Sequence, residues 1–172
     1  PENGNSDASF SNSHDYFILY HSSANEPLTV KLFKSTGEEI RELENNDDLK
    51  TKIAALNLGD KEFFDFKTSE GVTLNGWMIK PNDFDKSKKY PVLMYVYGGP
   101  GSQTVTNSMG GNDLWHQMMA QKGYIIVSVD NRGTGARGKD FRTQTYRQLG
   151  KYETMDQIEA ARWLGELSYV DA

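Results

Sequence analysis

The stretch YPVLMYVYGGPGSQ, residues 90–103, joins an apolar run to a glycine-rich loop. Val92–Val96 contains no polar side chain, which is typical of a strand that is buried on both faces of a parallel sheet. The run stops at Tyr97, and Gly98 and Gly99 follow at once. Ligands of open parallel sheets bind outside the carboxyl ends of the strands. We therefore expect a functional site at Tyr97.

The elements around this strand alternate between strand and helix. A second apolar run, YIIVSVD at Tyr124–Asp130, predicts another buried strand. A helix is predicted for residues 112–122, between the two strands, with Gly123 as its C-terminal cap. A further helix is predicted for Glu153–Leu167, with acidic Glu153 and Asp156 in its first turn. The residues expected on the buried helix faces are Leu114, Trp115, Met118 and Met119 in the first helix, and Met155, Ile158, Ala161 and Leu164 in the second. This order predicts an α/β domain whose parallel sheet is covered by helices on both sides.

The first half of the chain has a different pattern of predicted elements. The segments YFILYHSS, LTVKLFK and EEIREL, at residues 16–23, 28–34 and 38–43, predict short strands separated by turn-forming clusters. Three strands at this spacing are typical of an antiparallel meander or one blade of a β-propeller. Residues 45–56 predict a helix with Leu49, Ile53 and Leu56 on one face. A hairpin is then expected from EFFDFKT and VTLNGWMIKP, around the turn SEG.

Composition excludes several classes of function. The 172 residues are enough for one domain or for pieces of two, and the net charge of −5 has no basic cluster for nucleic acid. The chain has no cysteine, which excludes disulfides, thiolate nucleophiles and cysteine metal sites. No window approaches about 18 apolar residues, so no membrane span is predicted. The polar start has no signal-peptide core and no initiator Met, and we therefore expect a piece of a longer protein.

The glycines after Tyr97 allow backbone N–H groups to face a ligand without a side chain in the way. Acyl transfer requires such donors, because a developing oxyanion must be stabilised in a dry cleft. α/β-Hydrolases take one N–H donor from the loop at this place, and a tyrosine O–H can also donate. The alternative is that Gly98 and Gly99 only form a tight turn and that Tyr97 packs its ring.

A second glycine pattern lies in DNRGTGARG, where Gly133, Gly135 and Gly138 satisfy the G-x-G-x-x-G fingerprint of dinucleotide sites. The first glycine comes three residues after the predicted strand, whereas the fingerprint places it at the strand end. We prefer a hinged loop in which Asp130 and Arg132 hold neighbouring loops by hydrogen bonds. No cofactor is predicted.

The remaining polar residues do not indicate a metal site. The chain has three histidines, His14, His21 and His116, and they have no ligand spacing. The adjacent acidic pairs are interpreted as solvated charges or helix caps, since neighbouring side chains point in different directions. These pairs are Glu38 with Glu39, and Asp47 with Asp48.

Three motifs in order resemble the prolyl oligopeptidase family of serine peptidases, and the dipeptidyl peptidase IV branch most. They are KYPVLMYVYGGPGSQ, YIIVSVDNRGTGARG and RQLGKYETMDQIEAARWL…YVDA. FSNSHDYFILYHSSANEPLTVKLFKSTGEEIRELENN resembles the last propeller blade before the family's hydrolase domain, and GVTLNGWMIKP resembles the first hairpin of that domain. The resemblance implies a partial α/β-hydrolase sheet preceded by antiparallel strands of a propeller. Residues 1–59 would end the propeller and include a linking helix, and residues 60–172 would begin the catalytic domain.

The resemblance also implies an activity, the release of short N-terminal peptides, often ending in proline, through a Ser-His-Asp triad. Tyr97 matches the family tyrosine whose hydroxyl helps to form the oxyanion hole, with Gly98, Gly99, Asp130 and Arg132 as loop support. No G-x-S-x-G occurs in the sequence, so the nucleophile, the acid and the histidine are expected beyond Ala172. The chain alone is therefore predicted to be inactive.

Two other functions stay open. One is another acyl hydrolase of the same superfamily, an acylaminoacyl peptidase or an esterase. The other is a non-catalytic binding homologue that has lost the serine. The resemblance implies peptide substrates, a homodimeric full-length protein and a location outside the cytoplasm. Unpaired strand edges and an incomplete sheet predict exposed apolar surface and self-association of the chain when it is alone.

Overall fold

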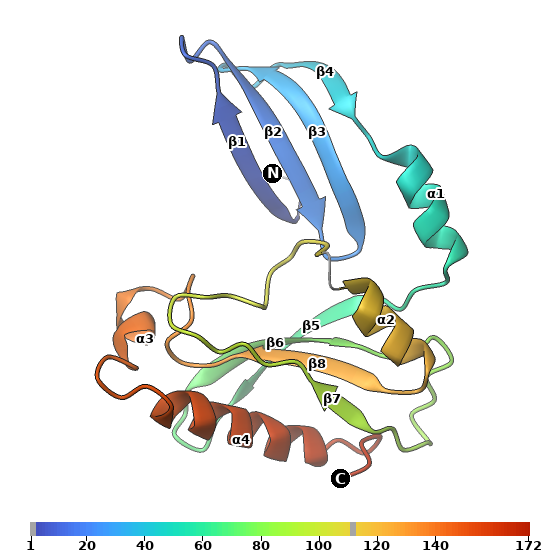
Figure 1. The fold of residues 1–172 in the computed structure, drawn as a ribbon, viewed down its shortest axis with the longest axis vertical. Coiled ribbons are helices and arrows are strands. Elements are labelled where there is room, and N and C mark those ends of the chain that lie inside the picture. The colour runs from blue at the N-terminus through green and yellow to red at the C-terminus, as the bar shows by residue number, and fades with distance from the viewer. Residues whose placement is uncertain (1–2, 111–112) are drawn as a thin grey trace. The chain divides into compact units, whose positions relative to one another are not determined.

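The computed structural model describes residues 3–110 and 113–172 (Figure 1). The chain forms two compact units. The first unit is Pro1–Leu58 with Thr106–Asp113, and the second is Gly59–Val105 with Leu114–Ala172. Each unit contains one four-stranded sheet. The second unit carries the residues that the sequence indicates as functional.

The first unit is an antiparallel meander in the order β1-β2-β3-β4. Its elements are β1 (Asn5–Phe10), β2 (Tyr16–Ser23), β3 (Glu26–Lys34), β4 (Glu39–Glu44) and the helix α1 (Asp47–Ala55). The three predicted strands are confirmed, and β1 is an additional strand. Its sequence, NSDASF, has weak strand propensity, and its antiparallel pairing with Phe17–Ser22 of β2 decides its conformation.

The prediction of an apolar face on α1 is wrong. Leu49 and Leu56 are exposed, and none of the helical residues is buried. Asn46 precedes the helix in the left-handed conformation, at φ 56°, and gives no side-chain cap. Its Nδ2 instead donates to the carbonyl oxygen of Leu28 on β3 at 2.6 Å. The acidic pairs in this unit are exposed, as predicted.

The second unit contains a mixed sheet in the order β5-β6-β8-β7. Its elements are β5 (Lys61–Lys67), β6 (Thr73–Ile79), β7 (Val92–Met94), α2 (Asp113–Gln121), β8 (Ile125–Asp130), α3 (Lys139–Thr143) and α4 (Lys151–Gly165). Only the β7–β8 pair is parallel, whereas β5, β6 and β8 pair antiparallel. The prediction of a parallel sheet therefore holds for its last two strands.

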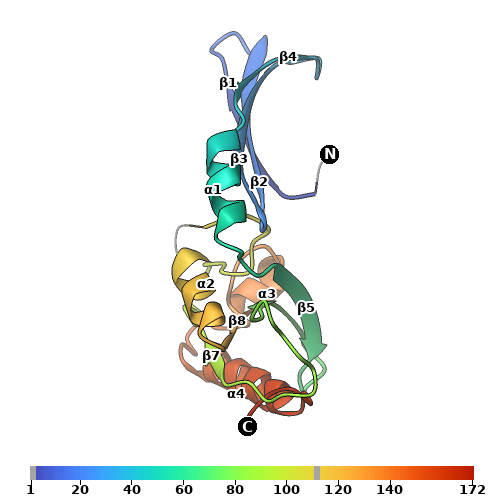
Figure 2. The ribbon, with the colours of Figure 1, turned by 90° about the vertical axis from the view of Figure 1, so that its right-hand side faces the viewer.

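Helices cover both faces of this sheet. Alternate residues of β8 point to opposite faces, as the period of a strand requires. Val127 packs with Leu164 of α4 in one apolar cluster, and Ile126 packs with Ala120 of α2 in the other. All six residues of β8, including Ser128 and Asp130, are buried, which confirms the prediction of a buried strand. Figure 2 shows the second unit turned by 90°, with α2 and α4 on different sides of the strands.

The prediction of which residues face the core holds only in part: Leu164 is buried and Met119 packs against the second apolar cluster, whereas most of the other predicted residues are exposed. On α2, Leu114, Trp115 and Met118 are exposed. The helix instead buries His116, Gln117 and Ala120. On α4, Ile158 and Ala161 are exposed, and the buried residues are Asp156, Ala160 and Leu164. Gln117 and Asp156 take part in the buried faces because they have hydrogen-bond partners there, which an apolar pattern does not show.

The strand β7 is shorter and less buried than its sequence predicts. It ends at Met94, so Tyr95 and Val96 belong to the loop, and all three strand residues are only half-buried. The strand pairs with β8 on one side only in the described residues, which leaves its other side less covered. The backbone continues alongside β8 for one residue, since Tyr95 N donates to Val127 O at 2.8 Å.

The caps of the two helices follow the sequence signals in part. Gly123 follows α2 at φ +91°, as a C-terminal glycine cap requires. Asn112, the predicted first residue of that helix, lies outside the described residues. Glu153 accepts a hydrogen bond from Gly150 N at 3.0 Å at the start of α4. Asp156 lies one turn further on than predicted. Across residues 3–110 and 113–172, no helix is long and apolar enough to cross a membrane.

Candidate functional site

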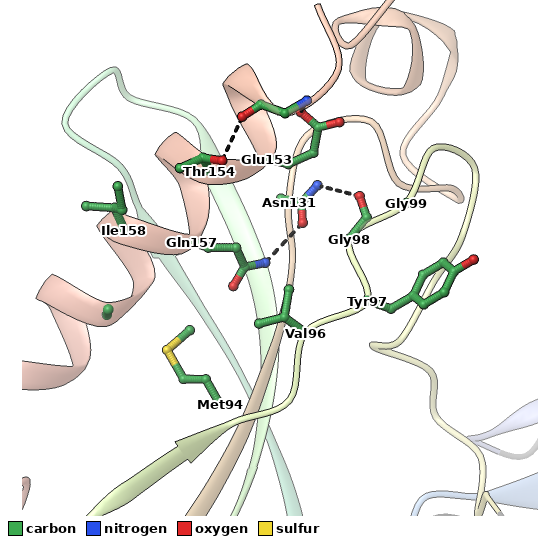
Figure 3. Close-up of a pocket in the computed structure, with 12 residues that line it drawn as sticks. Met94, Val96, Tyr97, Gly98, Gly99, Asn131, Glu153, Thr154, Gln157 and Ile158 are labelled. Carbon is green, nitrogen blue, oxygen red and sulfur yellow. Dashed lines mark hydrogen bonds between the residues drawn. The ribbon is translucent and has the colours of Figure 1, made fainter.

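Tyr97 lies in the loop that leaves the carboxyl end of β7, three residues after the last strand residue. Its side chain is 67% exposed. Figure 3 shows the ring pointing away from α4, with its hydroxyl directed outward. The ring lies against the backbone of Gly99, where a Cβ would be 2.8 Å from its Cε1 atom. A ring packed into the core, the alternative that the sequence left open, is not observed.

The glycine turn, residues 98–101, is held in one conformation by bonds at its own backbone. Gly98 and Gly101 have φ of +68° and +72°, which side chains with a Cβ rarely adopt. The carbonyl oxygen of Gly99 accepts hydrogen bonds from both the N–H and the hydroxyl of Ser102. The turn is therefore closed by Ser102, a residue that the sequence did not single out.

Backbone hydrogen bonds connect the loop after β8 to the glycine turn. Gly101 N donates to Gly133 O at 2.8 Å, and Gly135 N donates to Ser102 O at 2.7 Å. A Cβ at Gly133 would lie 2.5 Å from the side chain of Thr145. Gly133 and Gly135 thus allow the loop after β8 to lie close to the glycine turn and to Thr145. They are followed by the five-residue helix α3, not by the long helix of a dinucleotide site.

Asp130, the last residue of β8, binds the segment that follows the glycine turn. Its Oδ1 accepts hydrogen bonds from the N–H and the hydroxyl of Thr104 at 2.9 and 2.7 Å. Its Oδ2 accepts from Val105 N at 3.0 Å. Trp77 adds a bond from Nε1 to Thr104 O at 3.0 Å. The carboxylate is buried and satisfied by loop donors, so it holds the end of the loop next to the sheet.

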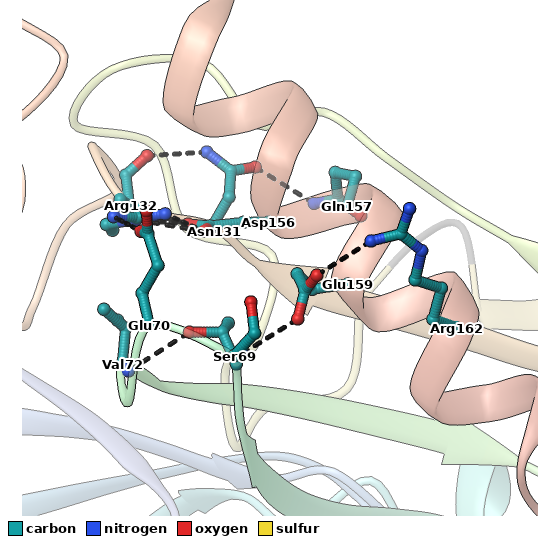
Figure 4. Close-up of polar contacts among 10 residues, drawn as sticks. Ser69, Glu70, Val72, Asn131, Arg132, Asp156, Gln157, Glu159 and Arg162 are labelled. Carbon is teal, nitrogen blue, oxygen red and sulfur yellow. Dashed lines mark hydrogen bonds and ion pairs between the residues drawn. The ribbon is translucent and has the colours of Figure 1, made fainter.

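Arg132 forms a buried ion pair with Asp156 of α4 (Figure 4). Its Nη2 and Nε donate to Oδ1 of Asp156 at 2.7 and 3.0 Å, and the backbone N–H of Arg132 donates to Oδ2 at 2.7 Å. Nη1 donates to Glu70 at 2.7 Å, and the guanidinium lies over the ring of Tyr152. The hydrogen bonds to Asp156, followed by those to Glu70, raise the pKa of Arg132. This network fixes the loop after β8 to α4.

A cavity of about 550 Å³ lies between the glycine turn and α4 (Figure 3). Met94 and Val96 line it from the β7 side, and Gln157 and Ile158 line it from α4. The lining is mostly apolar, and Gly98 contributes to its wall. The backbone of Tyr97 borders the cavity while the ring points elsewhere, so the phenol and the cavity are on different sides of the turn.

Sequence reasoning did not indicate Asn131 and Gln157. Asn131 is fully buried and bonds to Gly98, and Gln157 bonds to Asn131 from α4. No spacing marks these two amides, although Asn131 lies between the two loop residues that were singled out. The position of Asn131 directly after a buried strand was the one signal available, and Gln157, in the middle of α4, had none.

Each of the three histidines has its own separate surroundings. His14 lies in a turn, His21 bonds to Ser6 through Nδ1 at 2.7 Å, and His116 packs among aromatic rings on α2. Within the described part of the chain, no group of three or more His, Cys, Asp or Glu residues is arranged to hold a metal ion.

Comparisons with known proteins show which family this chain resembles. A sequence model of the Prolyl oligopeptidase family matches residues 113–172. The chain is 38% identical over 165 residues to Prolyl endopeptidase FAP of Homo sapiens, which covers 95% of the chain and 21% of that protein. It is 40% identical over 157 residues to Dipeptidyl aminopeptidase B of Saccharomyces cerevisiae, covering 89% of the chain and 17% of that protein.

Two solved structures are similar over nearly the whole chain. The crystal structure of Porphyromonas gingivalis dipeptidyl peptidase 4 matches with a TM-score of 0.94 and 46% identity, over 98% of this chain and 24% of that one. A putative dipeptidyl aminopeptidase IV from Bacteroides ovatus matches with a TM-score of 0.87 and 33% identity, over 99% and 24%. The resemblance predicted from the motifs is confirmed. The chain spans about a fifth of the length of the curated relatives that it matches.

Proposed function

Because this chain belongs to the prolyl oligopeptidase family, we propose that it is a segment of a serine exopeptidase that releases N-terminal dipeptides of the Xaa-Pro type. The names of its relatives, dipeptidyl peptidases and a prolyl endopeptidase, support a peptide substrate. In this proposal residues 1–59 end a propeller domain with its linking helix, and residues 60–172 open the catalytic domain.

The observation that carries the proposal is an exposed phenol on a rigid turn at the carboxyl end of a parallel strand. The Tyr97 hydroxyl is free to reach solvent, and the turn beneath it is fixed by Ser102, Asn131 and Gly133. Fixed donors stabilise a transition state better than mobile ones, because they require no reorganisation when charge develops. We infer that Tyr97 is an oxyanion-hole donor and that Gly98 and Gly99 keep its approach open.

The reaction follows from the chemistry of acyl transfer. A serine hydroxyl, supplied by a part of the protein outside this segment, attacks the scissile carbonyl, and its proton passes to a histidine. The carbonyl oxygen becomes negatively charged, and the O–H of Tyr97 donates a hydrogen bond to it. Collapse of this intermediate breaks the C–N bond, the histidine gives its proton to the departing amine, and the dipeptide is left on the serine as an ester. Water then hydrolyses the ester by the same route.

The test uses the full-length protein and chromogenic substrates with Xaa-Pro, acylated amino acids and simple esters. We expect hydrolysis of the Xaa-Pro amides and its loss with a serine-directed inhibitor. Tyr97→Phe should lower kcat by about 10²- to 10³-fold, the usual effect of removing one oxyanion donor. Preference for acylated or ester substrates would indicate another acyl hydrolase, and complete inactivity would indicate a binding homologue. Either result contradicts the proposal.

A further inference from the structure

Asn131 joins the glycine turn to β8 and α4 (Figure 3). Its side chain is 0% exposed. Nδ2 donates to Gly98 O at 3.1 Å and to Arg132 O at 2.7 Å, and Oδ1 accepts from Nε2 of Gln157 at 3.0 Å. Of the side chains of this size, only an amide both donates twice and accepts in this way. A residue with this role cannot be replaced by Asp, Ser or Leu without leaving a backbone carbonyl unpaired.

Gln157 decides which way the Asn131 amide faces. Nε2 of Gln157 also donates to the backbone carbonyl of Val129 at 2.9 Å. A carbonyl oxygen can only accept, so the nitrogen of Gln157 must be on this side of its amide. The atom of Asn131 that meets the same nitrogen must then be its oxygen. Nδ2 of Asn131 is thereby directed toward Gly98 O, and the helix α4 sets the orientation of the whole relay.

Gly98 and Asn131 also fit each other sterically. A Cβ at Gly98 would lie 2.7 Å from Oδ1 of Asn131, so the amide occupies the space that any other residue would fill. Gly98 directly follows Tyr97, and the Tyr97 side chain is largely exposed to solvent. The direction of the phenol therefore depends on the backbone that carries it. The side chain of Asn131 holds that backbone one residue away.

We propose that Asn131, oriented by Gln157, is the positioning residue for the Tyr97 hydroxyl. This inference rests on the proposed function, since it assigns Tyr97 the role of oxyanion donor. Without the amide, the Gly98 carbonyl loses its donor and the turn loses its contact with β8 and α4. The phenol then samples directions in which it cannot reach the oxyanion, and transition-state stabilisation is lost while ground-state binding is kept.

The kinetic test compares Asn131→Ala, Tyr97→Phe and the double variant in the full-length protein. Asn131→Ala should lower kcat by about 10- to 100-fold, because small misplacements of a catalytic group have effects of this size. KM should stay within about twofold, as expected for an interaction made only in the transition state. The double variant should be no slower than Tyr97→Phe alone, since there is no longer a hydroxyl to position.

Gln117→Ala is the matched control. Gln117 is also a buried amide that holds backbone, with Nε2 donating to Gly59 O at 2.6 Å and Oε1 accepting from Gly59 N at 2.9 Å. The substitution removes comparable hydrogen bonds, but they hold Gly59 and not the glycine turn, so kcat should stay within about twofold. An equal loss in Asn131→Ala and Gln117→Ala, or multiplicative losses in the double variant, would overturn the inference.

Amide hydrogen exchange gives a second readout that does not need activity. The N–H groups of Gly101 and Ser102 donate to Gly133 O and Gly99 O at 2.8 and 3.1 Å, so both are protected. In Asn131→Ala they should exchange at least about tenfold faster, while amides of β8 keep their rates. Unchanged exchange overturns the positioning role. If the full-length protein is an inactive homologue, the proposed function fails, and this measurement alone decides the role of Asn131.

Discussion

Arg132 shows how a single residue can define a loop. Its guanidinium is buried, and a buried charge is tolerated only when it is paired and hydrogen-bonded. Asp156 meets this requirement with both carboxylate oxygens, while Glu70 contributes from a half-exposed position. The pairing with Asp156 therefore holds the loop between β8 and α3 against α4. The same loop holds the glycine turn, so the ion pair stabilises the site indirectly.

We predict that Asp156→Asn destabilises this unit strongly. The substitution keeps the volume but leaves Arg132 buried without its main counter-charge, which typically costs about 3–5 kcal/mol. Glu70→Gln is the matched control, because Glu70 is 48% exposed and such pairs contribute about 1 kcal/mol or less. Urea unfolding of the full-length proteins, followed by tryptophan fluorescence, measures the difference. Equal losses in the two variants would show that the buried pair is not the main contributor.

At the scale of an element, α4 links the β5–β6 hairpin to the loops of the site. Asp156 and Gln157 hold the loop after β8, and Glu159 accepts a hydrogen bond from Ser69 N in the hairpin turn at 2.9 Å (Figure 4). Trp163 stacks on Phe66 of β5 in the same interface. The helix α4 thus makes both apolar and polar contacts, and its position sets the positions of the hairpin turn and of the loop after β8.

The Ser69–Glu159 contact predicts a pH-dependent contribution to stability. The hydrogen bond from Ser69 N, assisted by Arg162, lowers the pKa of Glu159 below its ordinary 4.5. Because the pKa of Glu159 is lower in the folded than in the unfolded state, the carboxylate stabilises the fold at pH values above the pKa of the unfolded state. This contribution disappears as the pH falls through the pKa of the folded state. The Tm of the wild type should therefore exceed that of Glu159→Gln at pH 7, and the difference should shrink below about pH 4.5.

Glu166→Gln serves as the control for this experiment. Glu166 is exposed just beyond the end of α4, and the same substitution there removes a charge without removing the bond to Ser69. The Tm difference between wild type and Glu166→Gln should stay nearly constant over the same pH range. A Tm difference between wild type and Glu159→Gln that stays the same from pH 7 to pH 3 would contradict the lowered pKa of Glu159.

At the scale of the whole molecule, the chain exposes many large apolar side chains. In the first unit these include Phe10, Tyr20 and Leu28, and in the second Leu114 and Trp115. Apolar surface of this kind normally contacts other protein. Strand β7 also leaves an unpaired edge in the described residues. The chain therefore has the surface properties of part of a larger assembly.

We predict that the 172-residue chain, expressed by itself, hydrolyses no Xaa-Pro substrate and self-associates. It lacks a G-x-S-x-G nucleophile motif, so the phenol of Tyr97 has no partner for acyl transfer. Its apolar surface and open strand edges favour association. Sedimentation analysis and a peptidase assay on the isolated chain test both statements. Turnover that a serine-directed inhibitor abolishes would refute the first, and a monomer with one sharp thermal transition would refute the second.

The sequence alone determined the positions of nearly all the strands and helices, the turn glycines and the family. Local physics explains this success, because a strand such as Ile125–Asp130 is recognisable from its mostly apolar run and a cap such as Gly123 from its conformational freedom. Tyr97–Gly99 lie at the carboxyl end of β7, as the sequence predicts, whereas the functional site there and the catalytic role of Tyr97 stay predictions.

Only the tertiary structure decided which faces are buried and which amides and charges hold the site. Leu114 and Ile158 are exposed, and Gln117, Asn131 and Asp156 lie inside. An apolar pattern indicates how much surface a helix can bury, but a polar group becomes stable in the interior only when specific partners meet it there. For Asn131 and Asp156 those partners come from the loop after β8, from α4 and from the glycine turn, which lie far apart in the chain, and the fold alone brings them together.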